Sequence, residues 1–367
     1  MLRIGFDGRA LASPAGGVRR YTRELFGALA GLGGDRRIVA VGPPTGVALP
    51  RGVRAEPAAP SLRSNAGWML TGLPLAARRA RLDLFHAPAY TVPVMSPRPL
   101  VVTIHDVSYE RHPEWYPYRR DPVRRAFYRW CARAADRVIT DSAFSRAEIS
   151  AAYDIPPERI DVVPLAASSA FTPGPALPLP PAVPRRYVLH VGDLHKRRNL
   201  DVLVRAMSRL RSIDPHLRDV GVVLAGVDRQ EAHDALSADE MNASGAIALG
   251  SADEATLLAL YRSAAALVYP SRYEGFGLPL VEAMACGVPV IASRASCIPE
   301  VTGDAAVLLD PDDVEGWTAA LAELFNPADW WLHAYYGVPA ERSLTGVRFG
   351  RHPWRVARWL CLRASGF

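Results

Sequence analysis

Short apolar stretches alternate with segments of helical periodicity through most of the chain. Buried strands are predicted at residues 2–7, 37–41, 82–86, 100–105, 137–140, 160–163, 187–191, 220–226, 246–249, 266–269, 288–292 and 306–309. Helices are predicted between them, for example at residues 18–32, 122–135, 143–152, 200–210 and 255–263. This alternation is typical of parallel sheets whose strands are joined by crossover helices.

The alternation is interrupted at residues 171–184, where the many prolines argue against a helix and a central strand. We therefore predict an α/β protein with two Rossmann-like, doubly wound domains at residues 1–170 and 186–326, joined by a proline-rich linker at 171–185. Such sheets bind ligands at the carboxyl ends of their strands, so a site is expected in a cleft that both domains face. Residues 327–367 form an atypical tail rich in Trp and Arg.

The composition is that of an ordinary soluble globular protein, with 49% hydrophobic and 22% charged residues. The pI of about 9.3 would suit a nucleic-acid-binding protein. However, residues 330–367 hold six arginines and a single acid, and so carry most of the net charge of +6. No nucleic-acid partner is therefore predicted. The G-x-G-x-x-G and P-loop motifs are also absent, so the usual dinucleotide and nucleoside-triphosphate sites are not expected.

The four cysteines form no C-x-x-C pair. This spacing argues against a zinc site and a disulfide framework, and indicates a reducing compartment. No apolar run approaches the roughly 18–20 residues of a membrane helix, and the first residues lack the pattern of a signal peptide. We therefore predict a cytoplasmic protein.

The most informative segment is residues 269–292, in which a strand end is followed by a glycine loop, a helix and another strand. Gly275 and Gly277 can adopt backbone angles that other residues avoid, and they allow a ligand to approach closely. Pro279 suits the first turn of a helix, which is predicted to end at Gly287. The start of that helix would offer an anion the backbone N–H groups of Phe276, Gly277 and Leu278.

Two carboxylates flank this predicted anion site. Glu274 lies on the loop before the helix and Glu282 lies one turn into it. Two acids would be out of place as phosphate ligands. They suit the hydroxyl groups of a sugar beside the phosphate.

Three cations, Lys196, Arg197 and Arg198, stand at the start of another predicted helix. Positive charge is unfavourable there because of the helix dipole, so the three residues point to an anionic ligand. A diphosphate is the natural candidate, since guanidinium groups can bind phosphate oxygens in bidentate fashion. A solvated surface cluster is the alternative.

Two further candidates lie in the first predicted domain. Gly16 and Gly17 directly precede a helix and could offer N–H groups to an anion; a plain loop pair is the alternative. His105 follows a strand, where active-site groups collect; a structural histidine is the alternative.

Two other polar segments are assigned to the fold. Asp312 or Asp313 is expected to cap the helix that runs through residues 317–325, and no metal site is predicted. Asp121 is expected to cap a basic helix that continues to residue 136. The apolar face of this helix, which we expect to pack on the core, comprises Val123, Phe127, Trp130 and Ala134. A membrane-surface role for the helix is the alternative.

Together these residues resemble glycosyltransferase family 4, whose members are retaining enzymes of the GT-B fold. The most specific match is the family's E-x7-E motif at Glu274 and Glu282. Further matches are Gly16-Gly17, His105-Asp106, Ser142 to Glu148 and Lys196 to Asn199. The segment at residues 105–116 resembles the branch that contains mannosyltransferases of polysaccharide and O-antigen assembly.

The resemblance implies a role for each matching residue. Glu282 would hold the ribose hydroxyls of a nucleotide sugar, and Glu274 a hydroxyl of the donor sugar. Arg197 and Arg198 would neutralise the leaving diphosphate, and His105 would lie near the reacting carbon. Further donor contacts would come from Gly16, Gly17, Phe276, Gly277 and Leu278.

The implied activity is that of a retaining hexosyltransferase, with GDP-mannose favoured as donor and a glycan or lipid-linked molecule as acceptor. No metal and no cofactor are expected, since the nucleotide sugar is a substrate. Peripheral contact with the inner face of the membrane is left open.

Two departures from the family keep alternatives open. The family usually has lysine where this chain has Arg198, and residues 327–367 match no family helix, which suggests a shifted reading frame or a divergent terminus. A nucleotide-sugar-binding protein impaired in turnover is therefore a second hypothesis. An epimerase or phosphorylase is a third. A phosphorylase would need a lysine that binds pyridoxal phosphate. The chain has one lysine, Lys196, and it lies in the motif predicted to bind phosphate.

Overall fold

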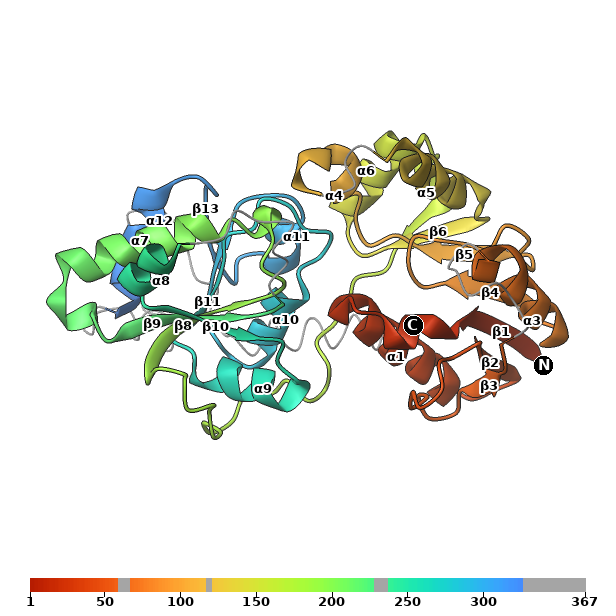
Figure 1. The fold of residues 1–367 in the computed structure, drawn as a ribbon, viewed down its shortest axis with the longest axis horizontal. Helices are drawn as coiled ribbons and strands as arrows, with labels where there is room; N and C mark the ends of the chain where they lie inside the picture. Colours follow the sequence, from red (N-terminus) through yellow and green to blue (C-terminus); the bar gives the residue numbers. More distant parts are fainter. Residues whose placement is uncertain (59–66, 117–120, 228–236, 326–367) are drawn as a thin grey trace. The chain divides into compact units, whose positions relative to one another are not determined.

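The computed structural model describes residues 1–58, 67–116, 121–227 and 237–325 (Figure 1). The chain forms two compact units. Among the described residues, the first contains those up to 111 and from 121 to 164, and the second contains those from 112 to 116 and from 165 to 325. The tail at 327–367, with the frameshift hypothesis attached to it, lies outside the described residues.

The first unit is built on a seven-stranded parallel sheet in the order β3-β2-β1-β4-β5-β6-β7. Its strands are β1 (Leu2–Asp7), β2 (Arg36–Val41), β3 (Arg54–Glu56), β4 (Leu84–Ala87), β5 (Leu100–Thr103), β6 (Arg137–Thr140) and β7 (Ile160–Val162). The strand order reverses between β1 and β4, which is where ligands bind in sheets of this kind. Strand β3 was not predicted, because Arg-Ala-Glu at a sheet edge carries no apolar pattern.

The α-helices of the first unit are α1 (Gly16–Gly31), α3 (Leu73–Arg79), α4 (Ser108–Arg111), α5 (Pro122–Ala134) and α6 (Ala143–Tyr153). Shorter helical turns span Gly8–Ala12, Trp68–Gly72 and Pro157–Arg159. Helix α1 packs on the sheet through Phe26, whose ring stacks on Phe6 of β1 at 3.8 Å. That contact holds the second half of α1 against β1.

The predicted apolar face of α5 packs only in part, because Phe127 and Ala134 are half-buried but the other two residues are exposed. Val123 is 76% exposed and Trp130 is 40% exposed. The fully buried residues of the helix are instead Cys131 and Ala132, and the Cys131 Sγ accepts a hydrogen bond from the backbone N–H of Val92. These small side chains let the helix lie close to its neighbours, whereas the larger apolar stripe faces outward. The predicted N-cap is confirmed, since Asp121 Oδ1 accepts from the N–H of Arg124 at 2.9 Å.

The second unit has a six-stranded parallel sheet in the order β10-β9-β8-β11-β12-β13. Its strands are β8 (Arg186–Val191), β9 (Val220–Ala225), β10 (Ala246–Gly250), β11 (Ala266–Tyr269), β12 (Val290–Ser293) and β13 (Val307–Leu309). Its α-helices are α7 (Leu200–Ile213), α8 (Ala238–Ser244), α9 (Glu254–Ser263), α10 (Leu278–Ala285), α11 (Ile298–Thr302) and α12 (Val314–Phe325). Short turns lie at Pro113–Trp115, Lys196–Arg198 and Pro215–Leu217.

Both faces of the second sheet are covered, which explains why its strands are continuously apolar. Along β8, Tyr187 and Leu189 join the core under α9 and α10, while Val188 joins the core under α7 and α12 (Figure 1). Phe171, from the predicted linker, is buried in the first of these cores. The strand order reverses between β8 and β11. The predicted pair of doubly wound α/β sheets is thus confirmed.

One predicted helix cap can be placed on this fold. Asp313 caps α12, with its Oδ1 accepting from the N–H of Gly316 at 2.9 Å. Among the described residues, no group of His, Cys, Asp and Glu side chains could hold a metal ion. Within those same ranges, no helix has the length and hydropathy needed to cross a bilayer.

Candidate functional site

The loop from β11 to α10 builds a largely buried helix start in the second unit. Gly277 has φ +89° and is the N-cap of α10, and a Cβ there would come within 2.8 Å of the Leu280 side chain. Gly275 does not have a positive φ, so the predicted need for glycine applies to Gly277 alone. Pro279 lies in the first turn, as predicted. The helix ends before Gly287, which has φ +74°.

The backbone N–H groups of Phe276, Gly277 and Leu278 lie ahead of the first hydrogen bond within the helix, which the N–H of Leu280 donates to the Gly277 carbonyl. The helix itself therefore leaves these N–H groups without partners. The positive end of the helix dipole adds to their attraction for an anion.

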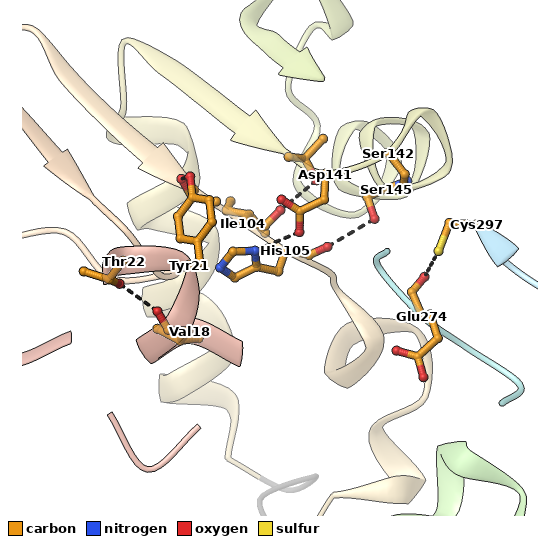
Figure 2. A network of polar contacts seen from close by, with 12 residues as sticks. Val18, Tyr21, Thr22, Ile104, His105, Asp141, Ser142, Ser145, Glu274 and Cys297 are labelled. Carbon is orange, nitrogen blue, oxygen red and sulfur yellow. Dashed lines mark hydrogen bonds and ion pairs between the residues drawn. The ribbon is translucent and has the colours of Figure 1, made fainter. Parts of the chain in front are cut away.

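Both motif carboxylates are buried beside this helix start. Glu282 is 2% exposed and accepts a hydrogen bond from the Tyr261 hydroxyl at 2.9 Å. Glu274 is 4% exposed, and its backbone N–H donates to Ser296 Oγ at 3.0 Å. Its carbonyl accepts a hydrogen bond from the Cys297 thiol at 3.2 Å (Figure 2). Because burial of a carboxylate is costly, these contacts indicate a site that holds the acids in fixed positions.

The three cations that follow β8 differ from one another. Lys196 is exposed, Arg197 is half-buried and Arg198 is buried. The turn that carries them is tied to the loop after β11, because the Arg197 carbonyl accepts from the N–H of Arg272 at 2.8 Å. Asn199 strengthens this tie by donating from its side chain to the Pro270 carbonyl at 3.2 Å. No pattern in the sequence indicates either of these two contacts.

Arg198 is the cation at the centre of the site. It forms a buried ion pair with Glu274, and it also donates to the Tyr269 hydroxyl and lies over that ring at 5.3 Å. A Cβ on Gly192 would come within 3.2 Å of its guanidinium, so glycine makes room for this side chain. Burial and the charge of Arg198 lower the pKa of the neighbouring His190 to about 3, which keeps that histidine neutral.

The first unit places His105 at the end of β5. Its Nδ1 lies 2.8 Å from Oδ2 of Asp141, which directly follows the adjacent strand β6 (Figure 2). Asp141 is 2% exposed and was not predicted as a site residue. The backbone carbonyl of His105 accepts a hydrogen bond from Ser145 Oγ at 3.2 Å, which fixes the loop to α6.

A buried polar network continues from His105 toward α1. The Tyr21 ring meets the imidazole edge-on at 4.7 Å, and its hydroxyl lies 2.8 Å from Thr103 Oγ1. His86 Nε2 lies 2.8 Å from the same oxygen. Burial and the charge of His105 lower the pKa of His86 to about 4. The network therefore offers one histidine that is suited to carry a proton, and that residue is His105.

Gly16 and Gly17 are the first two residues of α1, so the helix begins two residues earlier than predicted. Neither has a positive φ. A Cβ on Gly17 would meet no atom within 4 Å, and one on Gly16 would reach only the end of the Arg19 side chain at 4.0 Å. Packing within the unit therefore does not require glycine here, and the space beside the helix start is open.

Each unit thus holds its own part of the predicted site. The second unit brings together Arg198, Glu274, Glu282 and the start of α10, while the first brings His105 close to α1. The sequence reasoning missed three supporting side chains, namely Tyr261, Tyr269 and Asp141. Tyr261 and Tyr269 look like ordinary core residues in the sequence, and Asp141 looks like a residue that caps a helix.

Comparison with known proteins places both units in one family. Residues 15–171 match the family model described as Glycosyltransferase Family 4, and residues 185–327 match the model described as Glycosyl transferases group 1. The chain is 34% identical to O-antigen chain mannosyltransferase B of Escherichia coli over 256 residues, which cover 67% of this chain and 66% of that protein. It is 32% identical to MMP alpha-(1->4)-mannosyltransferase of Mycolicibacterium hassiacum over 242 residues, 62% of this chain and 57% of that protein. The matches thus span less than two thirds of each relative's own length, 66% of the first and 57% of the second.

Solved structures agree on the fold. Sucrose-phosphate synthase from Thermosynechococcus elongatus aligns with a TM-score of 0.72 at 19% identity, covering 100% of this chain and 98% of that one. The lipopolysaccharide glycosyltransferase WaaG aligns with a TM-score of 0.67 at 15% identity, covering 98% of this chain and 99% of that one. The chain therefore belongs to the group 1 glycosyltransferases of family 4, and its two units are the two α/β domains of the GT-B fold.

Proposed function

We propose that this protein is a retaining glycosyltransferase that moves a hexosyl group from a nucleotide sugar to a glycan or lipid-linked acceptor. One observation carries the proposal: two buried carboxylates, Glu274 and Glu282, flank a helix start beside the buried cation Arg198. A diphosphate needs the cation and the free N–H groups, and sugar hydroxyls need the carboxylates. A nucleotide sugar has both kinds of group.

In the proposed reaction, the donor diphosphate lies at the start of α10 and takes the place of Glu274 as the partner of Arg198. Glu274 then accepts a hydrogen bond from a hydroxyl of the donor sugar, and Glu282 accepts from the ribose. The bond from the anomeric carbon to the diphosphate oxygen breaks, and the acceptor oxygen bonds to the same face of that carbon. The acceptor proton passes to the leaving phosphate. Arg197 and Arg198 stabilise the charge that develops there.

GDP-mannose is our proposed donor, because both relatives described above are named as mannosyltransferases. We expect GDP-mannose to raise the melting temperature more than UDP-glucose or ADP-glucose at equal concentration. A ligand at a hundred times its Kd stabilises the folded state by about 2.7 kcal/mol, which a thermal-shift assay resolves. Transfer to an added glycan acceptor should persist in EDTA, since no metal is part of the proposal, and NMR should show that the product keeps the donor's anomeric configuration.

Two other outcomes of this panel would decide against the proposal. Stabilisation by a nucleotide sugar with neither transfer nor slow hydrolysis would favour the binding-only alternative. A melting temperature that no nucleotide sugar changes would rule out both functions.

We also propose that the protein is cytoplasmic and that α5 makes peripheral contact with an anionic bilayer. The outward stripe of α5 holds Val123 and Trp130, with the Phe127 ring stacked on Trp130 at 5.9 Å. The helix carries four arginines and no acid. An apolar stripe bordered by cationic side chains is the pattern of helices that lie in a membrane interface.

Replacing both Val123 and Trp130 by serine should weaken binding to vesicles that contain phosphatidylglycerol by about tenfold or more, because the loss of apolar burial costs more than ~1.4 kcal/mol. Co-sedimentation measures the affinity. Leu32→Ser is the matched control, since Leu32 is 66% exposed on the same unit but follows α1. If the control and the double variant bind alike, or if neutral vesicles bind as well as anionic ones, α5 is not the contact surface.

A further inference from the structure

The pairing of His105 with Asp141 has features that the fold alone does not explain. Asp141 is almost fully buried, and its Oδ2 lies 2.8 Å from His105 Nδ1. Its other oxygen, Oδ1, is buried and has no hydrogen-bond partner among the described residues. A buried carboxylate is costly unless it is paired. Since His105 is the one hydrogen-bond partner that the described residues give it, Asp141 is dedicated to that imidazole.

Among the described residues, the opposite edge of the imidazole meets the backbone carbonyl of Pro88, but not in a hydrogen bond of normal geometry. His105 Nε2 is buried and makes no hydrogen bond of normal geometry with the described residues. Figure 2 shows the ring between Asp141 and the first turns of α1, near Val18 and Tyr21. A buried nitrogen that lacks a well-formed hydrogen bond, on a ring that is so firmly held, favours a ligand that is not part of the chain.

Charged and titratable groups face His105 from every neighbouring element. Asp141 lies after β6, Asp106 lies on its own loop, His86 lies on β4 and Tyr21 lies on α1. Burial alone would lower the pKa of His105. The charge and hydrogen bond of Asp141, followed by the charge of Asp106 and the carbonyl of Pro88, outweigh burial and raise the pKa above its usual value.

We propose that Asp141 is a positioning residue that keeps His105 doubly protonated, so that its Nε2–H is presented to an oxygen of the donor. The role of Asp141 in catalysis rests on the proposed transfer reaction. The ion pair between His105 and Asp141 does not depend on that reaction. Deprotonation of an imidazole held in this way would remove the proton from Nε2, because Nδ1–H stays bonded to the carboxylate. The donor oxygen would then face a lone pair instead of an N–H group.

Asp141→Asn tests the inference, because it keeps the shape of the side chain and removes its charge. Titration of the His105 resonance by NMR should show a lower pKa in the variant. In transfer assays, kcat at pH 8 should fall roughly tenfold with little change in KM, less than the ~10²–10³-fold that loss of a direct transition-state donor costs. The decline of activity at high pH should move to lower pH in the variant, so the deficit should shrink as the pH falls.

Asp161→Asn is the matched control. Asp161 lies on β7 and pairs with Arg137 on the neighbouring strand, about half exposed. Its loss should change kcat less than about twofold, as expected for an exposed ion pair. A second variant, His105→Ala combined with Asp141→Asn, should be no less active than His105→Ala alone.

The outcomes separate this inference from the proposed function. An unchanged pKa of His105 in Asp141→Asn, or a deficit that is equal at every pH, would overturn the positioning role. A further loss of activity in the double variant would show that Asp141 stabilises the fold and does not act through His105. If the pKa falls in the variant but the wild-type protein transfers no sugar, the ion pair stands and the proposed reaction is wrong.

Discussion

Replacing Arg198 by alanine is expected to reduce kcat for glycosyl transfer by about 10²–10³-fold, the loss seen when one preorganised group that stabilises transition-state charge is removed. The same substitution should lower the free energy of unfolding by about 3–5 kcal/mol. Both effects have one cause. Arg198 is the buried partner of Glu274, and the proposed reaction exchanges that carboxylate for the leaving diphosphate.

A second variant separates the two effects. Arg198→Ala leaves the Glu274 carboxylate buried and unpaired, whereas Arg198→Ala combined with Glu274→Gln leaves no uncompensated charge. We expect the double variant to recover most of the lost stability and to stay inactive. Urea denaturation measures stability, and initial rates with saturating donor measure kcat.

Arg209→Ala is the matched control for this experiment. Arg209 lies on α7 and forms an ion pair with Glu315, but both side chains are more than half exposed. Its loss should cost less than about 1 kcal/mol and leave kcat unchanged. If Arg198→Ala keeps more than about a third of wild-type kcat, the diphosphate is not bound by Arg198. If the double variant is no more stable than the single one, the ion pair is not what stabilises the loop.

Glu282→Ala is expected to weaken binding of the nucleotide by about a hundredfold or more. Two hydrogen bonds from ribose hydroxyls to a carboxylate contribute about 1.5–3 kcal/mol each, and about 2.7 kcal/mol corresponds to a hundredfold change in Kd. Calorimetry with GDP and with GDP-mannose measures the change. Because the lost contact is to the ribose, both ligands should lose a similar factor.

The hydroxyl of Tyr261 provides a graded comparison. It donates to Glu282 at 2.9 Å, so Tyr261→Phe removes the group that orients the carboxylate and keeps the carboxylate itself. We expect a loss of roughly tenfold in this variant. Glu315→Ala, on the exposed start of α12, is the control and should bind like wild type. Unchanged nucleotide affinity in Glu282→Ala would remove the ribose assignment.

Much of the secondary structure followed from the sequence, because burial on both faces of a parallel sheet leaves a continuous apolar run. Strands β6 and β11 have the predicted ends, and α9 begins within one residue of its predicted start. The cap at Asp121 was also predicted, and that of α12 was predicted at Asp312 or Asp313, since an N-cap depends on residues three apart in the chain. Local patterns of this kind need no knowledge of the tertiary structure.

The sequence failed where two apolar stripes compete on one helix. In α5 the larger side chains, Val123 and Trp130, predicted the core face, but Cys131 and Ala132 form it. Helical periodicity predicts that a helix has apolar stripes, but it does not predict which stripe faces the sheet. The distance between helix and sheet decides that, and it is a property of the packed unit.

The sequence by itself determined which residues end the strands, and so which loops carry Arg198, Glu274 and His105. The tertiary structure alone decided which of those residues meet. Arg198 follows β8 and Glu274 follows β11, and they pair because these strands are neighbours in the sheet. His105 and Asp141 pair for the same reason, after β5 and β6. Strand order depends on long-range packing, so no local pattern records that Arg198 and His105 each have a charged partner on an adjacent loop.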